Sequence, residues 1–285
     1  MNAGPNSAQA ERWAGAAGHH WVEHEADYDR QLADCGTALI DAARLDGQAQ
    51  VLDVGCGTGT TAIAAARHAR RVLGVDLSPV MIERARARAG GCANVDFEVA
   101  DAQTAAFEAA FDVVISRFGL MFFADARAAF ANLRLAVVPG GRLAAVCWQS
   151  LDRNDWMRVP GEALAQVVPL GDIAEPGQPG PFSLGSREEL TRLLADTGWD
   201  DIAVDGLTFP VPVGGARSLD DAVEFVRGGS LGRSALAGVS PAVERRALGA
   251  VRDALAPYAT GEGVLLAGAA WLVRASNGAT EAPRR

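Results

Sequence analysis

Residues 51–60 read VLDVGCGTGT, a short apolar run that leads into three alternating glycines. The apolar run is typical of a buried parallel strand. The glycines predict a tight turn that brings the backbone close to a ligand at the start of the next helix. Asp53, at the end of the run, would repel a pyrophosphate, but it would attract a ligand with a cationic amino-acid end. The stretch therefore predicts a ligand site at one edge of an α/β sheet.

The spacing of the glycines argues against a dinucleotide site. Such sites use the pattern G-x-G-x-x-G, whereas Gly55, Gly57 and Gly59 give G-x-G-x-G and Thr60 stands at the third dinucleotide position. The chain also contains no lysine, so the Ser-Tyr-Lys set of some nicotinamide enzymes is missing. An NAD-linked oxidoreductase is the least favoured of the alternatives, and a nicotinamide binding assay would decide it.

Strands and helices are expected to alternate outward from this turn. Strands are predicted at 51–54, 71–75, 95–99, 112–116, 142–148, 202–209 and 263–273. Helices are predicted at 60–69, 79–89, 104–108, 124–137 and 187–194, and the stretches 7–44 and 219–258 read as mostly helical. The alternation predicts an α/β fold, namely a Rossmann-like, seven-stranded, mostly parallel sheet with helices on both faces.

The composition of each region predicts how the chain is divided. A helical N-terminal lid is expected first, and two insertions are expected to interrupt a continuing core. The expected parts are a lid (1–46), a ligand-binding core (47–150), a loop-rich, proline-containing insertion (151–182), a core continuation (183–210), a helical cap insertion (211–260), a last core strand (261–275) and a tail (276–285).

Two further acidic residues follow the next two predicted strands. Asp76 can accept hydrogen bonds from both hydroxyls of a ribose, and Asp101 could accept one from the exocyclic amine of an adenine. The carboxyl ends of parallel strands share one edge of a sheet, so Asp53, Asp76 and Asp101 are expected along one rim. Each could instead cap a helix, although Ser78 already occupies the cap position that follows Asp76.

Five stretches of the sequence together resemble a known family. The runs VLDVGCGTGT, VLGVDLSPVMIERARAR, NVDFEVADAQT, FDVVISRFGLMFF and LRLAVVPGGRLAAVCW are similar to class I S-adenosylmethionine-dependent methyltransferases, more narrowly to the small-molecule enzymes of the type 11 and type 25 kind. The resemblance implies S-adenosylmethionine as the methyl donor and S-adenosylhomocysteine as the product. It implies the following donor-binding residues: Asp53, Gly55, Cys56, Gly57 and Gly59 around the methionine end, Asp76 on the ribose, Leu77 and Met81 beside the adenine, Asp101 and Ala102 at the adenine edge, and Ser116 and Arg117 toward the methyl group.

A general base is needed only if the acceptor must lose a proton. The candidates are residues of the predicted lid, which would fold over the rim of the sheet: His20, His24, Glu25 and Tyr28. His20 and His24 lie one helical turn apart, so a metal site, a surface helix and a lining of the acceptor pocket are all compatible with them. Since the four cysteines are widely spaced, no metal site is expected, and Cys56 is interpreted as a small filler of the turn.

Composition limits the partners of the protein. A net charge of -9 disfavours nucleic acid, and the absence of a long apolar run disfavours a membrane span. A soluble cytoplasmic protein, monomeric or homodimeric, is expected. The expected acceptor is a small molecule with an oxygen, nitrogen or carbon nucleophile. The lack of lysine and the Ala, Arg and Gly bias favour a bacterial source of high GC content, and together with the small-molecule core they favour specialised metabolism. A lipid or quinone methyltransferase and a non-catalytic S-adenosylmethionine binder are the alternatives.

Overall fold

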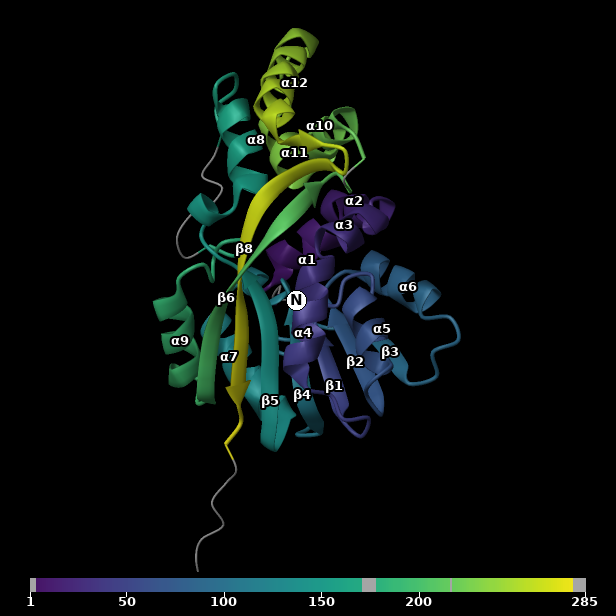
Figure 1. The fold of residues 1–285 in the computed structure, drawn as a ribbon. Coiled ribbons are helices and arrows are strands. Elements are labelled where there is room, and N and C mark those ends of the chain that lie inside the picture. Colours follow the sequence, from purple (N-terminus) through teal and green to yellow (C-terminus); the bar gives the residue numbers. More distant parts are fainter. Residues whose placement is uncertain (1–3, 171–177, 216, 279–285) are drawn as a thin grey trace, which may run out of the picture.

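The computed structural model describes residues 4–170, 178–215 and 217–278, and one mixed sheet forms its centre (Figure 1). The strand order is β3-β2-β1-β4-β5-β8-β6, and a two-residue strand, β7, pairs with β8. The strands are β1 (Gln50–Val54), β2 (Arg71–Asp76), β3 (Val95–Val99), β4 (Phe111–Arg117), β5 (Val137–Trp148), β6 (Asp200–Val213), β7 (Ala259–Thr260) and β8 (Gly263–Ser276). β1 to β5 are joined in parallel, whereas β8 runs antiparallel to both β5 and β6. The predicted Rossmann-like, mostly parallel sheet is confirmed.

Helices cover both faces of the sheet. α5 (Thr60–Ala66) and α6 (Pro79–Arg88) connect β1 to β2 and β2 to β3, and right-handed crossovers in the same direction place both helices on one face. The chain then crosses to β4 and moves in the opposite direction, so α7 (Ala126–Ala136) covers the other face, where α9 (Arg187–Asp196) contacts it. This topology reverses the strand order between β1 and β4, which is the place where open α/β sheets bind ligands.

Three helices begin at a residue whose side chain caps the helix, and two of these caps were expected from the sequence. Ser78 accepts a hydrogen bond from the amide of Met81, with Pro79 at the first helical position. Ser186 likewise caps α9 through the amide of Glu189, and Asp125 caps α7. These caps satisfy amides that a helix leaves unpaired at its start, so they fix where each helix begins.

Two predicted elements are wrong or incomplete. No helix forms at 104–108, where the chain makes a turn; Asn132 donates 2.9 Å hydrogen bonds to the carbonyls of Ala102 and Ala105, which replaces the helical bonding that so short a segment cannot sustain. The insertion at 151–182 is not only loop, because it contains η2 (Leu151–Arg153) and α8 (Asp155–Ala165). Part of that insertion, 171–177, and the end of the predicted tail, 279–285, lie outside the described residues.

The first helices of the chain and several helices of the C-terminal half form two layers above the carboxyl edge of the sheet, whereas the helix just before β1 packs on the face of the sheet against β4 and β5. The N-terminal helices are α1 (Ser7–Ala14), α2 (Ala16–Glu23), α3 (Glu25–Gln31) and α4 (Ala33–Ala43). The predicted helical stretch 219–258 is broken into α10 (Leu219–Gly228), α11 (Ser230–Ala235), α12 (Pro241–Leu255) and η3 (Ala256–Tyr258). β6 and β8 extend beyond the sheet, and their ends pack against α8, α10, α11 and α12 in a second hydrophobic core (Figure 1). We call α1 to α3 the lid and α8, α10, α11 and α12 the cap.

Candidate functional site

The loop between β1 and α5, residues 55–59, consists of glycines at every second position, and we call it the glycine loop. Gly55, Gly57 and Gly59 all have positive φ values, of 66°, 55° and 85°. A Cβ on Gly55 would lie 2.7 Å from the Cα of Gly119, so packing alone requires this glycine. A Cβ on Gly57 would meet only the sulfur of Met81 at 3.7 Å. Gly57 therefore leaves backbone open toward a ligand.

Asp76, at the tip of β2, is bound to the glycine loop. Its Oδ2 accepts a hydrogen bond of 2.9 Å from the amide of Gly57, and its Oδ1 accepts one of 2.9 Å from the amide of Ser78. Burial raises the pKa of Asp76, and the two amides oppose this shift by stabilising the carboxylate. A carboxylate oxygen has more than one lone pair, so both oxygens can still accept hydrogen bonds from ligand hydroxyls.

Asp53 lies behind the glycine loop and is 1% exposed. Neither of its carboxylate oxygens has a well-formed hydrogen bond among the described residues. Burial raises the pKa of Asp53 to about 7, and the cation of Arg117 opposes that rise. An unpartnered buried acid of this kind favours a cationic group in the space next to the loop.

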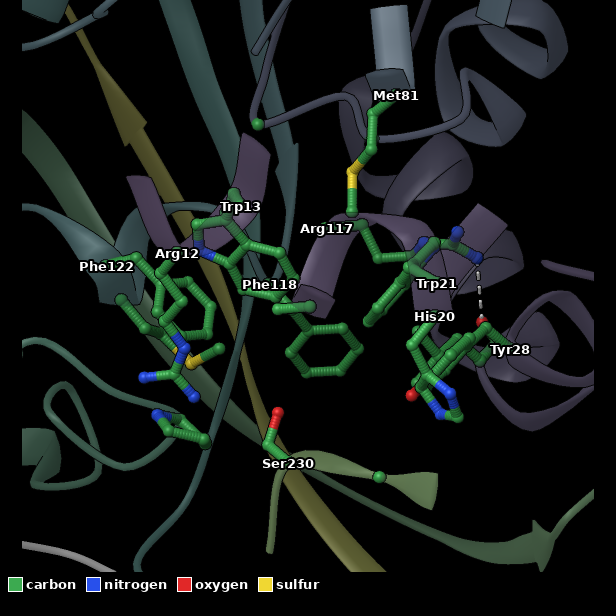
Figure 2. A pocket seen from close by; sticks show the side chains of 18 of the residues that line it. Arg12, Trp13, His20, Trp21, Tyr28, Met81, Arg117, Phe118, Phe122 and Ser230 are labelled. Carbon is green, nitrogen blue, oxygen red and sulfur yellow. Dashed lines mark hydrogen bonds between the residues drawn. The ribbon is translucent and has the colours of Figure 1, made fainter. Parts of the chain in front are cut away.

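A cavity of about 250 Å³ opens beside the glycine loop and lies between the sheet, the lid and the cap (Figure 2). Gly55, Gly57 and Asp76 line its sheet side. The lid contributes Trp13, His20, Trp21 and Tyr28, the strand ends contribute Phe118 and Trp148, and the cap contributes Trp156, Phe225, Ser230 and Arg233. Most of the surface is therefore aromatic or aliphatic, with a few polar groups, as in small-molecule sites.

The lid is fixed to the rim of the sheet by Asn6, which is 2% exposed. Its amide nitrogen donates to Asp101 Oδ1 over 2.8 Å and to Gln103 Oε1 over 3.0 Å, while its amide oxygen accepts from the nitrogen of Ala124 over 2.7 Å. A second tie is made by Ser78, whose hydroxyl donates to the carbonyl of Trp13 over 2.7 Å. Trp13 is thereby held over the third-strand side of the cavity.

Phe118 shapes the floor of the cavity where β4 ends. It is a non-glycine residue with a φ of 63°, a conformation that costs free energy and that surrounding packing must enforce. Its ring stacks on Trp148, with centroids 4.2 Å apart. The turn also sets Gly119 against Gly55, so the β4 end and the glycine loop pack directly on one another.

The structure brings together seven of the twelve residues predicted to bind the donor. Those lining the cavity are Gly55, Gly57, Asp76, Leu77, Met81, Ala102 and Arg117. The other five lie behind or beside the lining: Asp53, Cys56, Gly59, Asp101 and Ser116. Gly59 packs on Phe97, and Ser116 donates to the carbonyl of Val54 over 2.7 Å, so both of these support the loop from behind.

Two of the four predicted bases line the cavity. His20 and Tyr28 do so, and Tyr28 stacks on Trp21 with centroids 3.8 Å apart. Burial raises the pKa of Tyr28 to about 12, and burial together with His24 and Arg233 lowers the pKa of His20 to about 4. His24 and Glu25 are not among the lining residues; Glu25 accepts a hydrogen bond of 2.9 Å from Arg84, which ties α3 to α6.

Several lining residues were not found by sequence reasoning, among them Arg12, Trp13, Trp21 and Arg233. They come from the lid and the cap, whose helices show apolar periodicity but no motif. Only the three-dimensional arrangement brings these distant segments together. Within the described ranges no cluster of three or more His, Cys, Asp or Glu side chains is placed to hold a metal ion, and none of the helices there has the length and hydropathy of a membrane span.

Comparisons with known proteins agree with this geometry. A family model described as a methyltransferase domain matches residues 51–141. An uncharacterised protein of Mycobacterium tuberculosis is 33% identical over 188 residues, which is 64% of this chain and 66% of that protein. The aklanonic acid methyltransferase of Streptomyces sp. (strain C5) is 36% identical over 132 residues, 43% of this chain and 60% of that enzyme.

Among solved structures, the YcgJ protein of Bacillus subtilis superposes with a TM-score of 0.59 at 18% sequence identity, covering 87% of this chain and 100% of that one. At that identity the likeness shows the fold alone. The family match spans the glycine loop, β2 with Asp76, β3, β4 and the start of β5, which are the elements that form the sheet side of the cavity. Residues 51–141 of the chain therefore form a methyltransferase domain.

Proposed function

We propose that the protein transfers the methyl group of S-adenosylmethionine to a small-molecule acceptor with an oxygen, nitrogen or carbon nucleophile. One observation carries the proposal: a single cavity is lined both by the glycine loop with Asp76 and by lid and cap side chains. A donor held at the loop therefore faces a second space in which an acceptor can lie. The name of the aklanonic acid methyltransferase, a relative from Streptomyces, supports a small molecule and a role in bacterial specialised metabolism.

The residues present fit the donor. Asp76 keeps free lone pairs for ribose hydroxyls, Gly57 leaves open backbone, and the unpartnered Asp53 favours a cation nearby. Bound S-adenosylmethionine would supply a methyl group on a sulfonium, with a neutral thioether as the leaving group. Leu77, Met81 and Ala102 would contact the adenine, while Gly55, Gly57 and Arg117 would contact the methionine end.

The lid and the cap would align the acceptor and exclude water, which is the main protein contribution to an in-line transfer. His20 is the base candidate that the geometry favours, because its Nε2 is buried and has no hydrogen-bond partner among the described residues. Its lowered pKa keeps the imidazole neutral near pH 7, so Nε2 can accept a hydrogen bond from an acceptor hydroxyl. The same shift makes His20 a weak base, so it suits an acidic hydroxyl such as that of a phenol. Tyr28, with its raised pKa, would stay protonated and orient the acceptor.

The test uses methyl-labelled S-adenosylmethionine with a panel of phenols, aromatic carboxylic acids, amines, quinols and lipids. We expect label transfer to at least one acceptor, and we expect Asp76→Ala to abolish it. On that acceptor His20→Gln should slow single turnovers about 100-fold if a proton must be removed, whereas His24→Gln, one turn away, should not. Donor binding without transfer to any member of the panel would instead favour the non-catalytic binder. Transfer only to a quinol or lipid would select that alternative, which the apolar lining also supports.

A further inference from the structure

The side chains that line the cavity carry more positive than negative charge. Its lining contains one carboxylate, Asp76, and three guanidinium groups, those of Arg12, Arg117 and Arg233. Asp76 is engaged by two backbone amides, and Arg117 lies 3.8 Å from Asp29 and near Asp53. In a chain with a net charge of -9, a cavity with surplus positive charge is a local feature that the overall composition does not explain.

Arg12 and Arg233 carry that surplus. Neither has an acidic partner within 4.0 Å in the part of the chain that the structure describes. Arg233 donates one hydrogen bond to the carbonyl of Gly228, and the guanidinium carbon of Arg12 lies 6.0 Å from the ring centroid of Trp13. Most of their ten N–H donors are therefore free to bind a ligand.

The two arginines act on one another across the cavity. Arg12 comes from α1 of the lid and Arg233 from α11 of the cap, and both line the same space. The pKa of Arg12 is lowered, first by its partial loss of solvent and then by the charge of Arg233. A guanidinium does not lose its proton in a protein, so the repulsion persists until an anion enters between the two groups.

The position of the pair separates it from the donor end of the cavity. Arg12 lies on α1 and Arg233 on α11, so both line the cavity from the lid and the cap, whereas the residues expected to bind the donor come from the strand ends and the glycine loop. Arg117 already occupies the region beside the glycine loop where the methionine end is expected. Trp148, Trp156 and Phe225 line the remaining space, which suits a flat apolar body.

We infer that the acceptor is an aromatic or other flat apolar molecule that carries a carboxylate, and that Arg12 and Arg233 bind this carboxylate between the lid and the cap. The inference rests on the proposed function, because it names the substrate class of the same cavity. It assigns Arg233 and Arg12 as specificity-determining residues rather than as members of the catalytic machinery. Bidentate contacts between guanidinium and carboxylate are strong and geometrically selective.

The experiment compares two probes that share one ring system and differ in charge, 2-naphthoate and 2-naphthamide. Binding of each is measured on the full chain with S-adenosylhomocysteine already bound, followed by the fluorescence of the cavity tryptophans. S-adenosylhomocysteine affinity is measured separately for every variant by calorimetry. The variants are Arg233→Gln, Arg12→Gln and, as a matched control, Arg245→Gln on the exposed face of α12.

We expect the carboxylate to bind at least about tenfold more tightly than the amide. Arg233→Gln should remove most of that preference and Arg12→Gln part of it, while amide binding, S-adenosylhomocysteine binding and the Arg245→Gln control stay unchanged. Equal binding of the two probes, or binding of neither to a protein that binds S-adenosylhomocysteine, would overturn the inference but not the proposed function. A loss of S-adenosylhomocysteine affinity in Arg233→Gln would place this arginine on the donor and also overturn it. If the wild-type chain binds no S-adenosylhomocysteine, the proposed function itself fails.

Discussion

At the scale of single residues, Gly57 and Asp76 depend on one another through a single hydrogen bond of 2.9 Å. Gly57 donates it from a backbone with a φ of 55°, a conformation that favours glycine. Both residues could be identified from the sequence, since alternating glycines and an acid at a strand end form a motif. Arg12 and Arg233 could not, because nothing in their neighbours in sequence distinguishes them from surface arginines.

Replacement of Asp76 should therefore affect ligand binding more than folding. We expect Asp76→Asn to weaken S-adenosylhomocysteine binding at least about tenfold, because each charge-assisted hydrogen bond to the ligand is worth about 1.5–3 kcal/mol. Calorimetric titration measures this. Asp96→Asn is the matched control, since Asp96 is a half-exposed acid on β3 paired with Arg71 at 2.9 Å. An equal loss in both variants would contradict the role given to Asp76.

Gly57→Ala separates backbone strain from ligand contact. A residue with a Cβ is strained at this positive φ, which should cost about 1–3 kcal/mol in the free energy of unfolding. Gly47→Ala should cost a similar amount, because Gly47 has a φ of 82° and open space around it, but it lies away from the cavity. Only Gly57→Ala should also weaken S-adenosylhomocysteine binding, as compared by denaturant titration and calorimetry on both variants. Unchanged affinity in Gly57→Ala would show that the ligand does not approach this backbone.

At the scale of elements, strands and long helices of the core were predictable because their apolar periodicity is strong, while the lid and cap were predicted only as helical regions. The pattern at 104–108 failed because tertiary hydrogen bonds from Asn132 replace helical ones there. The stretch 219–258 contains signals for its breaks, Gly228-Gly229 at the end of α10 and Ser240-Pro241 at the start of α12, but the prediction of one mostly helical stretch did not use them. How α1 to α3 close over the sheet depends on polar ties between distant residues, and spacing in the sequence cannot reveal these.

The hydrogen bonds of the Asn6 side chain are the main polar contacts that hold α1 against the sheet. Asn6→Ala removes three hydrogen bonds and leaves buried polar groups unpaired, so we expect a loss of about 2–4 kcal/mol in the free energy of unfolding or, more locally, a detached α1. Proteolysis near Trp13 should become faster, and S-adenosylhomocysteine binding should weaken several-fold. Asn94→Ala is the control: it removes two hydrogen bonds, to the carbonyls of Ala66 and Ala69, away from the lid. Slower or unchanged cleavage in Asn6→Ala would rule out the tether.

At the scale of the whole molecule, one sheet places the donor motif and two separate helical layers around a single cavity. The sheet and its ligand edge follow from the strand order, which was predictable from the alternation of elements. The cavity depends on β6 and β8 being long enough to carry the cap over the lid (Figure 1). Because the cap lies over the lid, His20 is partly buried and its pKa is lowered. The stability of the fold therefore depends on pH.

Burial of neutral His20 should lower stability in acid. Its pKa is about 4 in the folded chain and near 6.5 in an ordinary histidine, so between these values the unfolded chain binds more protons. The free energy of unfolding should therefore fall as the pH drops from about 6.5 to 4, by about 1–2 kcal/mol because solvent screens a half-buried group. Urea titrations across this range should show a shallower fall in His20→Gln than in wild type, and no change of slope in His68→Gln, which replaces an exposed histidine. Parallel curves for wild type and His20→Gln would contradict the assigned pKa.

The most direct test of the account is a calorimetric titration of the purified chain with S-adenosylhomocysteine. The arrangement of the glycine loop, Asp53 and Asp76 predicts saturable heat with one molecule bound per chain, and it predicts that NAD gives none. Absence of heat from S-adenosylhomocysteine under conditions where the chain is folded would contradict the assignment of this loop to an adenosyl donor.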